Sequence, residues 1–426
     1  MNLLKSFSVY VVNNIINASI PFLLIPVLTT YIKPEEYGMM TNVLVFISFT
    51  LPFVLLAMHG AVNTAFFREK KEDFPRYLSS VLVINLGGAA VSLILLLAFS
   101  PLILNYLEIP FKWILIIPFI CLFQTVCMIT LVIFQARKEP LKYGLFQISM
   151  TLLNFGASVL FVVSLGIGWE GRIYGILLSY LVFLIVGLLS IRKMGYLSGG
   201  VSKVFVKDAL KFGIPLIPHM ISAAIISMLD RLMITHFEGA YWNGLYTVAF
   251  QIGVVVNFLA DAFNKAWVPH LFENLSKINS FRKRKIVKQS YLFMLFFLCL
   301  PFALYVFTPL IFEWFIDEKY HYVQNYVFPI SMGAAFGGMY YVVANYIFYA
   351  KKTWMLAIVT TSSAILSFVL NLLFIPKFQT LGPTYTYVIV NFLMFVSVWI
   401  IASKVYPMPW FSFLRTEKDN EKHPAE

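Results

Sequence analysis

Long apolar segments recur along the whole chain of 426 residues, and this recurrence constrains the fold more than any other feature. Each segment is about as long as the ~20 residues with which an α-helix crosses a bilayer. They cover residues 7–32, 38–63, 77–100, 112–135, 142–166, 172–191, 212–237, 242–266, 288–310, 324–349, 353–375 and 380–403. Since 60 % of the residues are hydrophobic and 12 % are charged, we expect an all-α polytopic membrane protein with about twelve transmembrane helices.

The basic residues between the segments lie mostly on one side of the membrane. The chain has 32 Lys and Arg, and Arg231 lies inside a segment. Five fall in turns on the opposite side: Lys33, Lys112, Arg172, Lys319 and Lys377. Because Lys and Arg collect in cytoplasmic loops, we expect both termini in the cytoplasm. The basic run 282–285 and the net charge of +12 then reflect topology and attraction to anionic membrane lipids, and we expect no nucleic-acid binding.

Three short matches indicate an internal repeat with offsets of 206, 214 and 211 residues. They occur in the same order in both halves: residues 38–41 with 244–247, 134–138 with 348–352, and 171–174 with 382–385. Two six-helix units in the same orientation are related by an axis along the membrane normal. We therefore expect two pseudo-symmetric six-helix lobes around a central cavity, residues 1–200 and 201–404, followed by a cytoplasmic tail at 405–426.

Polar side chains recur at helical spacing in the first two segments of each half. Residues four apart share one face of a helix. The resulting stripes are Asn13 and Asn17; His59 and Asn63; His219, Ser227 and Asp230; and Asn257, Asp261 and Lys265. A polar face in lipid must turn toward protein or water, so we expect these stripes to line the cavity. For any single residue, snorkelling at a helix end or helix–helix hydrogen bonding is the alternative.

Asp230 and Arg231 are neighbours inside the apolar segment 212–237. Each costs about 2.5–3.5 kcal/mol at the centre of an inserting helix. Neighbouring side chains point about 100° apart, so we expect the two not to pair, with Asp230 facing the interior. Asp230 lies ~27 Å from the inner end of the segment, and therefore in the outer half of the bilayer. At this position its protonation could release an outer gate. The alternative is that it caps helix ends without exchanging a proton. By contrast, the spacing of Asp261 and Lys265 predicts an ion pair.

Several short motifs match a known family. They are Pro34-Glu35-Glu36-Tyr37-Gly38, Leu229-Asp230-Arg231-Leu232-Met233-Ile234, Gly244-Leu245-Tyr246, Pro269, and the turn at 375–382. With these, the chain resembles the polysaccharide transporter branch of the multidrug/oligosaccharidyl-lipid/polysaccharide exporter superfamily, in particular bacterial O-antigen flippases. It departs from the family at Pro383-Thr384-Tyr385, where small residues usually follow the glycine.

The resemblance implies a function in the bacterial inner membrane. An undecaprenyl-diphosphate-linked oligosaccharide would move from the cytoplasmic to the periplasmic leaflet by alternating access between the lobes. Lys265, Arg231 and protonated His59 could then attract its diphosphate. A polysaccharide polymerase and a chain-length regulator are candidate partners. No bound cofactor is expected, and coupling to H⁺ or Na⁺ is open.

Two other classes of function compete with this interpretation. An exporter of another small solute or drug shares the fold and would favour acidic groups in its cavity, whereas here Arg231 and Lys265 accompany Asp230 and Asp261. A membrane glycan polymerase needs acid and base residues, usually on a substantial outer loop. No such loop is present, and Cys121, Cys127 and Cys299 show no metal-ligand spacing, so we do not expect an enzyme.

Overall fold

The computed structural model of the protein describes residues 17, 20, 22–107, 109–197, 199–277, 279–350, 352 and 354–410, without the side chains of residues 219, 223 and 269. Within this part of the chain, ten helices are long and apolar enough to cross a membrane. A bent pair, Lys203–Ser222 and Ala224–Glu238, makes an eleventh span. The expected all-α polytopic membrane protein is thus confirmed. The first expected segment falls largely outside the described residues, among which its end forms the short helix Phe22–Tyr31.

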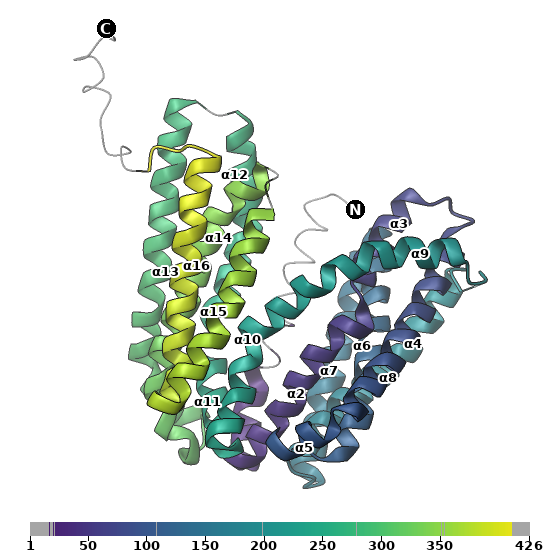
Figure 1. The fold of residues 1–426 in the computed structure, drawn as a ribbon, viewed down its shortest axis with the longest axis horizontal. Coiled ribbons are helices and arrows are strands. Elements are labelled where there is room, and N and C mark those ends of the chain that lie inside the picture. Colours follow the sequence, from purple (N-terminus) through teal and green to yellow (C-terminus); the bar gives the residue numbers. More distant parts are fainter. Residues whose placement is uncertain are drawn as a thin grey trace. The chain divides into compact units, whose positions relative to one another are not determined.

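The chain forms two compact units, drawn as ribbons in Figure 1. Unit 1 comprises Met1–Val248 and Phe312–Tyr322, and unit 2 comprises Ala249–Ile311 and Val323–Glu426. These units differ from the lobes expected at 1–200 and 201–404, because residues 201–248 pack with the N-terminal helices. The two six-helix lobes of the sequence repeat stay a prediction.

Unit 1 is a bundle of helices with short connections (Figure 1). Its elements are α2 (Pro34–Leu55), α3 (Met58–Arg68), α4 (Phe74–Ala98), α5 (Ser100–Leu107), α6 (Phe111–Ala136), α7 (Pro140–Val159), the π-helical turn η1 (Leu160–Ser164), α8 (Trp169–Lys193), α9 (Lys203–Gly213), the 3₁₀ turn η2 (Ile214–Leu216), α10 (Ile217–Glu238) and most of α11 (Ala240–Gly253). Met58, Tyr77, Ile129, Ile191 and Ala209 meet in its core and join α3, α4, α6, α8 and α9.

The second expected segment is broken between α2 and α3. Leu56 and Ala57 have φ angles of 47° and 53°, which are uncommon for residues other than glycine. The amide of Asn85 donates hydrogen bonds to the carbonyl oxygens of Val54 (2.8 Å) and Leu55 (3.2 Å). Backbone groups that a break frees inside a membrane need such partners. The break therefore has a polar support in α4, and α3 begins after it at Met58, one residue before His59.

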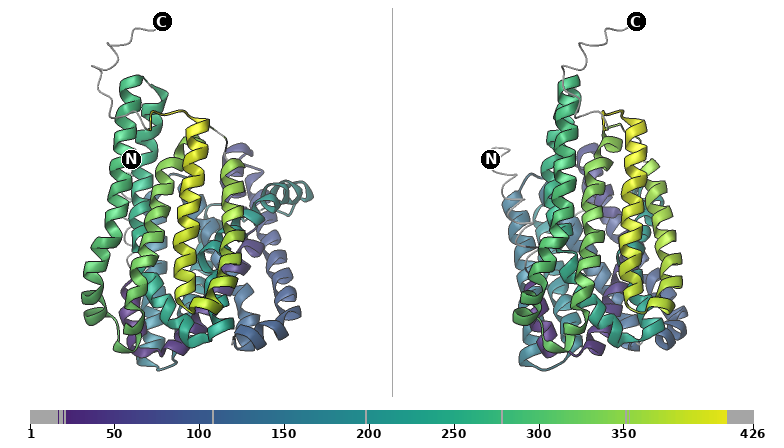
Figure 2. Two further views of the ribbon diagram at one scale, coloured as in Figure 1. Left: turned by 60° about the vertical axis from the view of Figure 1, so that its left-hand side comes forward. Right: turned by 90° about the vertical axis from the view of Figure 1, so that its left-hand side faces the viewer.

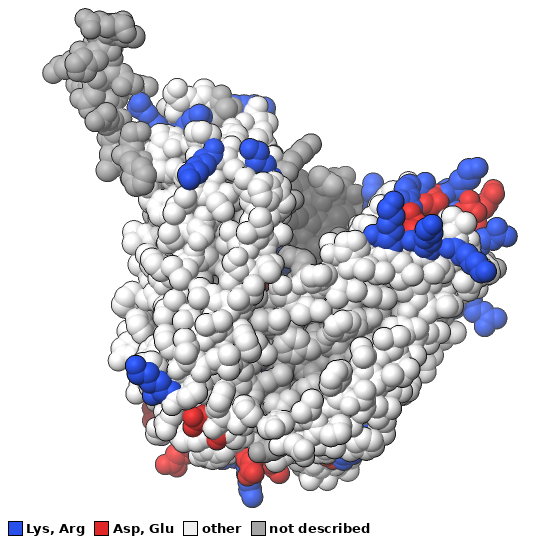
Figure 3. All heavy atoms as spheres, viewed as in Figure 1, with Lys and Arg blue, Asp and Glu red and all other residues white. Residues whose placement is uncertain are grey.

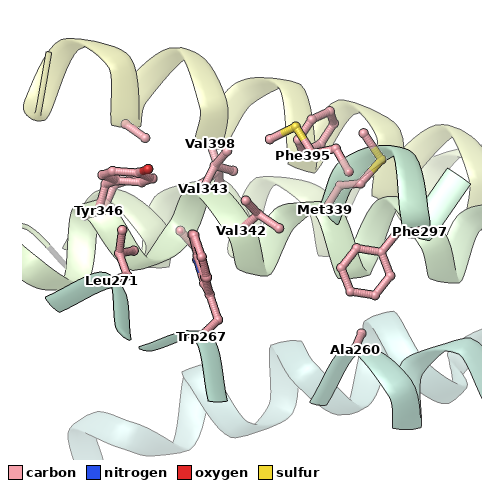
Figure 4. Close-up of a cluster of buried hydrophobic side chains, with 14 of the residues drawn as sticks. Ala260, Trp267, Leu271, Phe297, Met339, Val342, Val343, Tyr346, Phe395 and Val398 are labelled. Carbon is pink, nitrogen blue, oxygen red and sulfur yellow. The ribbon is translucent and has the colours of Figure 1, made fainter. Parts of the chain in front are cut away.

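Unit 2 is a bundle of long helices that Figure 2 shows from two sides. Its elements are α12 (Val255–Ser276), α13 (Ser280–Phe315, of which residues 280–311 belong to this unit), the end of the 3₁₀ segment η3 (Glu318–Tyr326), α14 (Val327–Tyr349), α15 (Trp354–Phe378) and α16 (Leu381–Val405). In Figure 4, Trp267, Phe297, Val342, Tyr346 and Val398 converge between α12, α13, α14 and α16. Since lipid tails are as apolar as these side chains, close packing rather than water exclusion holds such an interior together.

Residues 267–287, which lie between two of the expected apolar segments, are mostly helical. Here α12 continues to Ser276, and α13 begins at Ser280. At 36 residues, α13 is ~54 Å long, well beyond the ~30 Å of hydrocarbon that it needs to cross. Figures 1 and 2 show it running past the end of α16. Hydropathy marks where a helix leaves the lipid, and a helix of polar residues can continue beyond that point.

The expected tail also begins later than predicted. Residues 406–410 fold back onto unit 2, where Trp410 is 3 % exposed and its carbonyl oxygen accepts a hydrogen bond of 2.9 Å from the Tyr291 hydroxyl. The remainder, 411–426, lies outside the described residues. On unit 1, Figure 3 shows Lys and Arg gathered over α9 and the adjoining ends of α3 and α4, and an uncharged face along the helices. This is the side that the sequence predicts to be cytoplasmic.

Candidate functional site

Asp230 and Arg231 are both buried in α10, with 8 % and 6 % of their surface exposed. Contrary to the expectation from helix geometry, they pair directly: Nη1 of Arg231 lies 3.0 Å from Oδ1 of Asp230. The Arg231 backbone N–H also donates to Oδ1, and the Tyr246 hydroxyl donates to Oδ2. The long, flexible Arg side chain can turn back on its own helix, because Nη1 also reaches the Ser227 carbonyl oxygen at 2.6 Å. The pair thereby neutralises two charges that would be costly alone in a dry interior.

One helical turn farther along α10, a second polar cluster joins α2, α10 and α11. The Thr235 hydroxyl donates to Oδ1 of Asn42 at 2.9 Å. The Asn243 amide donates to the same oxygen at 2.8 Å and to the Gly38 carbonyl oxygen at 3.3 Å. Sequence analysis did not single out Asn42, Thr235 or Asn243. Their positions next to the repeat motifs could have indicated them, since Asn42 follows Gly38 by one helical turn and Asn243 directly precedes Gly244.

The glycines that open the two repeat motifs lie at this same place. A Cβ atom at Gly38 would overlap the carbonyl oxygen of Ala240, and one at Gly244 would overlap the carbonyl oxygen of Pro34. Glycine is therefore required for the close approach of α2 to α11. We call Gly38, Asn42, Thr235, Asn243 and Gly244 the seam. It lies at the end of unit 1 opposite the basic turns, which is the predicted outer end.

The segment 312–322 covers the beginning of α2 next to the seam. The Tyr320 hydroxyl donates to the Ile32 carbonyl oxygen at 2.9 Å, and the ring of Tyr320 packs edge-on against Tyr37 with centroids 5.8 Å apart. Nζ of Lys319 donates to the Thr30 carbonyl oxygen at 3.0 Å. Residues from both halves of the sequence thus contact each other within unit 1.

Arg172 was assigned to an outer turn, but it lies within α8 and turns onto α7. Nη1 donates hydrogen bonds to Oδ1 of Asn154 and, at 2.9 Å, to Oγ of Ser158. Among the described residues no carboxylate pairs with it, since nearby Glu170 accepts instead from Nζ of Lys112 at 2.6 Å. Hydropathy places a helix end only to within a few residues, so an arginine in the second turn was predicted as a loop residue.

The partners of Arg172 belong to a polar stripe on α7 that was not predicted from the sequence. Gln147, Thr151, Asn154 and Ser158 follow at intervals of four, three and four residues, which places them on one helix face. Asn17 lies against this stripe, where its side-chain oxygen accepts a hydrogen bond from the Thr151 hydroxyl. The spacing within an apolar segment was the signal that could have found it.

A cavity of about 340 Å³ opens at the other end of the stripe, and we call it the N-terminal cavity. Among the described residues it is lined by His59 of α3, by Gln124, Cys127, Met128, Leu131, Val132 and Gln135 of α6, by Tyr143, Gln147 and Met150 of α7, and by Tyr180 of α8. The structure therefore places one predicted site residue, His59, in a cavity. Asn63, one turn further along α3, is exposed.

The predicted stripe of α12 lies in unit 2. The Asn257 amide donates to the Tyr387 hydroxyl at 3.3 Å. Asp261 is exposed and close to the Tyr341 hydroxyl, and Lys265 is exposed as well. Neither takes part in an ion pair within the described part of the chain, so the expected Asp261–Lys265 pair does not form. Spacing of four residues permits such a pair, but two exposed side chains lose rotamer freedom to make it.

The remaining predicted site residues divide as follows. Asp230 and Arg231 lie together in unit 1, and the Ser227 side chain near them is exposed. Asn13 and the side chain of His219 lie outside the described residues. A cavity lined jointly by the stripes of both halves stays a prediction.

The arrangement of spanning helices, buried ion pair and internal polar cavity is typical of a membrane transporter. The sequence matches the model of the family described as Polysaccharide biosynthesis protein over residues 3–275. The chain belongs to this family, and it is a multi-pass membrane protein with the fold of the multidrug/oligosaccharidyl-lipid/polysaccharide superfamily.

Relatives and solved structures agree with this assignment. The chain is 26 % identical over 378 residues to the "Lsg locus putative protein 1" of Haemophilus influenzae, covering 86 % of this chain and 90 % of that one. An "Uncharacterized membrane protein" of the same organism is 25 % identical over 83 % of this chain and 85 % of its own length. In fold, the chain is similar to the lipid II flippase MurJ (TM-score 0.75, 14 % identity, 96 % and 89 % covered). It is also similar to a multidrug resistance MATE transporter (TM-score 0.74, 13 % identity, 92 % and 97 % covered).

Proposed function

We propose that this transporter of polysaccharide biosynthesis is a flippase. Its cargo would be an undecaprenyl-diphosphate-linked O-antigen or polysaccharide repeat unit, moved from the cytoplasmic to the periplasmic leaflet of the bacterial inner membrane. Such a lipid has an anionic diphosphate, a polar glycan and a long apolar tail. A flippase must shelter the first two groups and can leave the tail in the lipid.

The observation that carries this proposal is Arg172. Its guanidinium lies inside unit 1 with the neutral partners Asn154 and Ser158. A cation packed between membrane helices without a carboxylate partner is costly and is commonly functional. The acid Asp230, by contrast, is already neutralised by Arg231. The charge of Arg172, uncompensated by any carboxylate among the described residues, suits a diphosphate, because Arg binds phosphate oxygens with two parallel hydrogen bonds.

Alternating access would require the outer end to open. The seam is a suitable gate because hydrogen bonds and glycine contacts hold it, and these can be exchanged for water without exposing a large apolar core. With both termini in the cytoplasm, the seam faces the periplasm. Cysteine labelling from outside intact cells tests this orientation: a cysteine at Tyr322 should react and one at Asn279 should not. The reverse pattern would overturn the topology.

The experiment that tests the function is deletion of the gene, followed by mass spectrometry of lipid-linked intermediates. A flippase mutant accumulates the complete lipid-linked repeat with its glycan on the cytoplasmic face, whereas a polymerase mutant exports single units. Restoring the full chain should clear the intermediate. An unchanged lipid pool would reject the proposal.

A small-solute exporter is the second candidate. The observation that favours it is the exposed carboxylate of Asp261, which could attract a cation. If the protein has this function, deletion of the gene would change resistance to cationic compounds and leave the lipid-linked intermediate at its normal level.

A further inference from the structure

The N-terminal cavity contains polar groups that the fold does not use. Nδ1 of His59 is buried without a hydrogen-bond partner. The side-chain amide of Gln124 and the hydroxyl of Tyr180 make no hydrogen bond to the described part of the chain, although both line the cavity. A buried polar atom without a hydrogen-bond partner, such as this nitrogen of His59, is rare in proteins and needs a water or a ligand. The unpartnered nitrogen of His59, with the half-buried polar groups of Gln124 and Tyr180 around the same space, points to a bound polar molecule.

Backbone geometry holds His59 at this position. The break at Leu56 and Ala57 turns α3 away from the axis of α2, and His59 is the second residue of α3. Gly213 lies so close to the Leu56 carbonyl oxygen that a Cβ atom would overlap it. Together with Asn85, this contact fixes the break from two neighbouring helices. Behind the cavity, the aromatic core that includes Phe146 and Phe183 supports α6, α7 and α8.

The lining mixes polar and apolar side chains. It consists of amides, tyrosine rings and apolar side chains, with no Lys, Arg, Asp or Glu among the described lining residues. This composition does not suit a diphosphate, which needs cations. It suits sugar hydroxyls, which both donate and accept hydrogen bonds, and sugar rings, whose apolar faces pack on aromatic side chains. The volume of about 340 Å³ falls at the lower end of the range of roughly 300–1,000 Å³ for small-molecule sites.

The cavity and Arg172 lie along the same two helices. Tyr180 follows Arg172 by eight residues on α8, so the two are separated by ~12 Å along the axis. The α7 stripe of Gln147, Thr151, Asn154 and Ser158 connects them. A head group whose diphosphate contacts Arg172 would therefore have the cavity within reach of its glycan.

We propose that the N-terminal cavity is a glycan subsite, in which His59, Gln124 and Tyr180 hydrogen-bond a sugar of the lipid-linked cargo. This inference rests on the proposed flippase function and adds which part of the cargo unit 1 recognises. It makes Gln124 and Tyr180 determinants of sugar preference, distinct from the anion contact at Arg172.

The test compares lipids that differ only in the sugar. The full-length chain in lipid nanodiscs is titrated with undecaprenyl diphosphate and with the same lipid carrying one glucose, galactose or N-acetylglucosamine. The variants are Tyr180→Phe, Gln124→Leu and their combination. Tyr180→Phe removes only a hydroxyl, so it preserves the packing of α8. The matched control is Thr125→Val on α6, which removes a buried hydroxyl outside the cavity lining.

We expect the unmodified chain to bind at least one sugar-bearing lipid about tenfold more tightly than the bare diphosphate, as two or three net hydrogen bonds would provide. The double variant should lose most of this preference while binding bare undecaprenyl diphosphate normally, and Thr125→Val should keep it. A preference that survives in the double variant overturns the inference. So does an unmodified chain that binds the bare lipid and favours none of the three sugars. If it binds none of the four lipids, the flippase function itself fails, and the subsite with it.

Discussion

Gly38 of α2 and Gly244 of α11 lie against each other with only backbone between them: a Cβ atom on Gly244 would stand 2.9 Å from the Gly38 nitrogen. Each glycine opens the same motif in its half of the sequence. The two copies of this repeat motif thus contact each other in the structure, at the predicted outer end of unit 1. This contact also brings Asn42, Thr235 and Asn243 within hydrogen-bonding distance of one another.

Gly38→Ala or Gly244→Ala should therefore weaken the seam. The added methyl group has to displace a backbone carbonyl, and overpacking of this kind costs about 1–3 kcal/mol. We expect a lower Tm of the purified protein and loss of glycan export. Gly87→Ala in α4 is the control, because a Cβ atom there has no neighbour within 4 Å. Equal Tm values for all three variants would contradict the close approach.

Asp230→Asn tests whether the acid of α10 carries a coupling proton or is a static acceptor. The structure gives its carboxylate three donors, from Arg231 and Tyr246, which favours the static role. The variant removes the carboxylate that pairs with Arg231, and breaking a buried ion pair costs about 3–5 kcal/mol, so we expect a loss of stability of this size. Adding Arg231→Met should recover much of this loss.

The pH dependence of export separates the two roles of Asp230. For a static acceptor, the combined Asp230→Asn and Arg231→Met variant transports with the pH dependence of the unmodified chain. A flattened pH profile in a well-expressed double variant would instead assign proton coupling to Asp230.

Much of the fold was predictable because lipid imposes a simple rule on the sequence. The apolar segments marked the spanning helices, and the seam glycines were found as a repeat. What these glycines contact was not predictable, since short motifs carry no information on which helices cross. The same limit explains why Asn42 and Thr235 were missed.

The candidate site was less predictable than the fold. Asp230 was recognised as interior, but its pairing with Arg231 depends on a side-chain rotamer that spacing does not determine. Arg172 was misplaced because hydropathy does not define the end of a helix. The cavity at His59 depends on the break at Leu56 and Ala57, two residues whose left-handed backbone has no signature in the sequence.

Asp261 and Lys265 should behave independently in unit 2, because they form no ion pair. Asp261→Asn and Lys265→Gln should change stability additively, within about 0.3–0.5 kcal/mol. Thermal unfolding of both single variants and of the double variant measures this. A coupling energy well above that range would show that the two side chains interact, as the sequence predicted.

Arg172→Gln should separate anion binding from stability. The substitution removes a charge that has no carboxylate partner, so Tm should stay the same or rise. Binding of undecaprenyl diphosphate should weaken by about 10–100-fold, as loss of charge-assisted hydrogen bonds would cause. Arg172→Lys should retain part of the affinity, since Lys keeps the charge but not the paired donors.

The control for Arg172→Gln is Lys112→Gln, which removes a cation at the same end of the helices that is already paired with Glu170. Titration with undecaprenyl diphosphate and with phosphate-free undecaprenol isolates the contribution of the anion. If Arg172→Gln binds the diphosphate as tightly as the unmodified chain, Arg172 is not the anion site. A marked fall in Tm would instead identify its hydrogen bonds to Asn154 and Ser158 as structural.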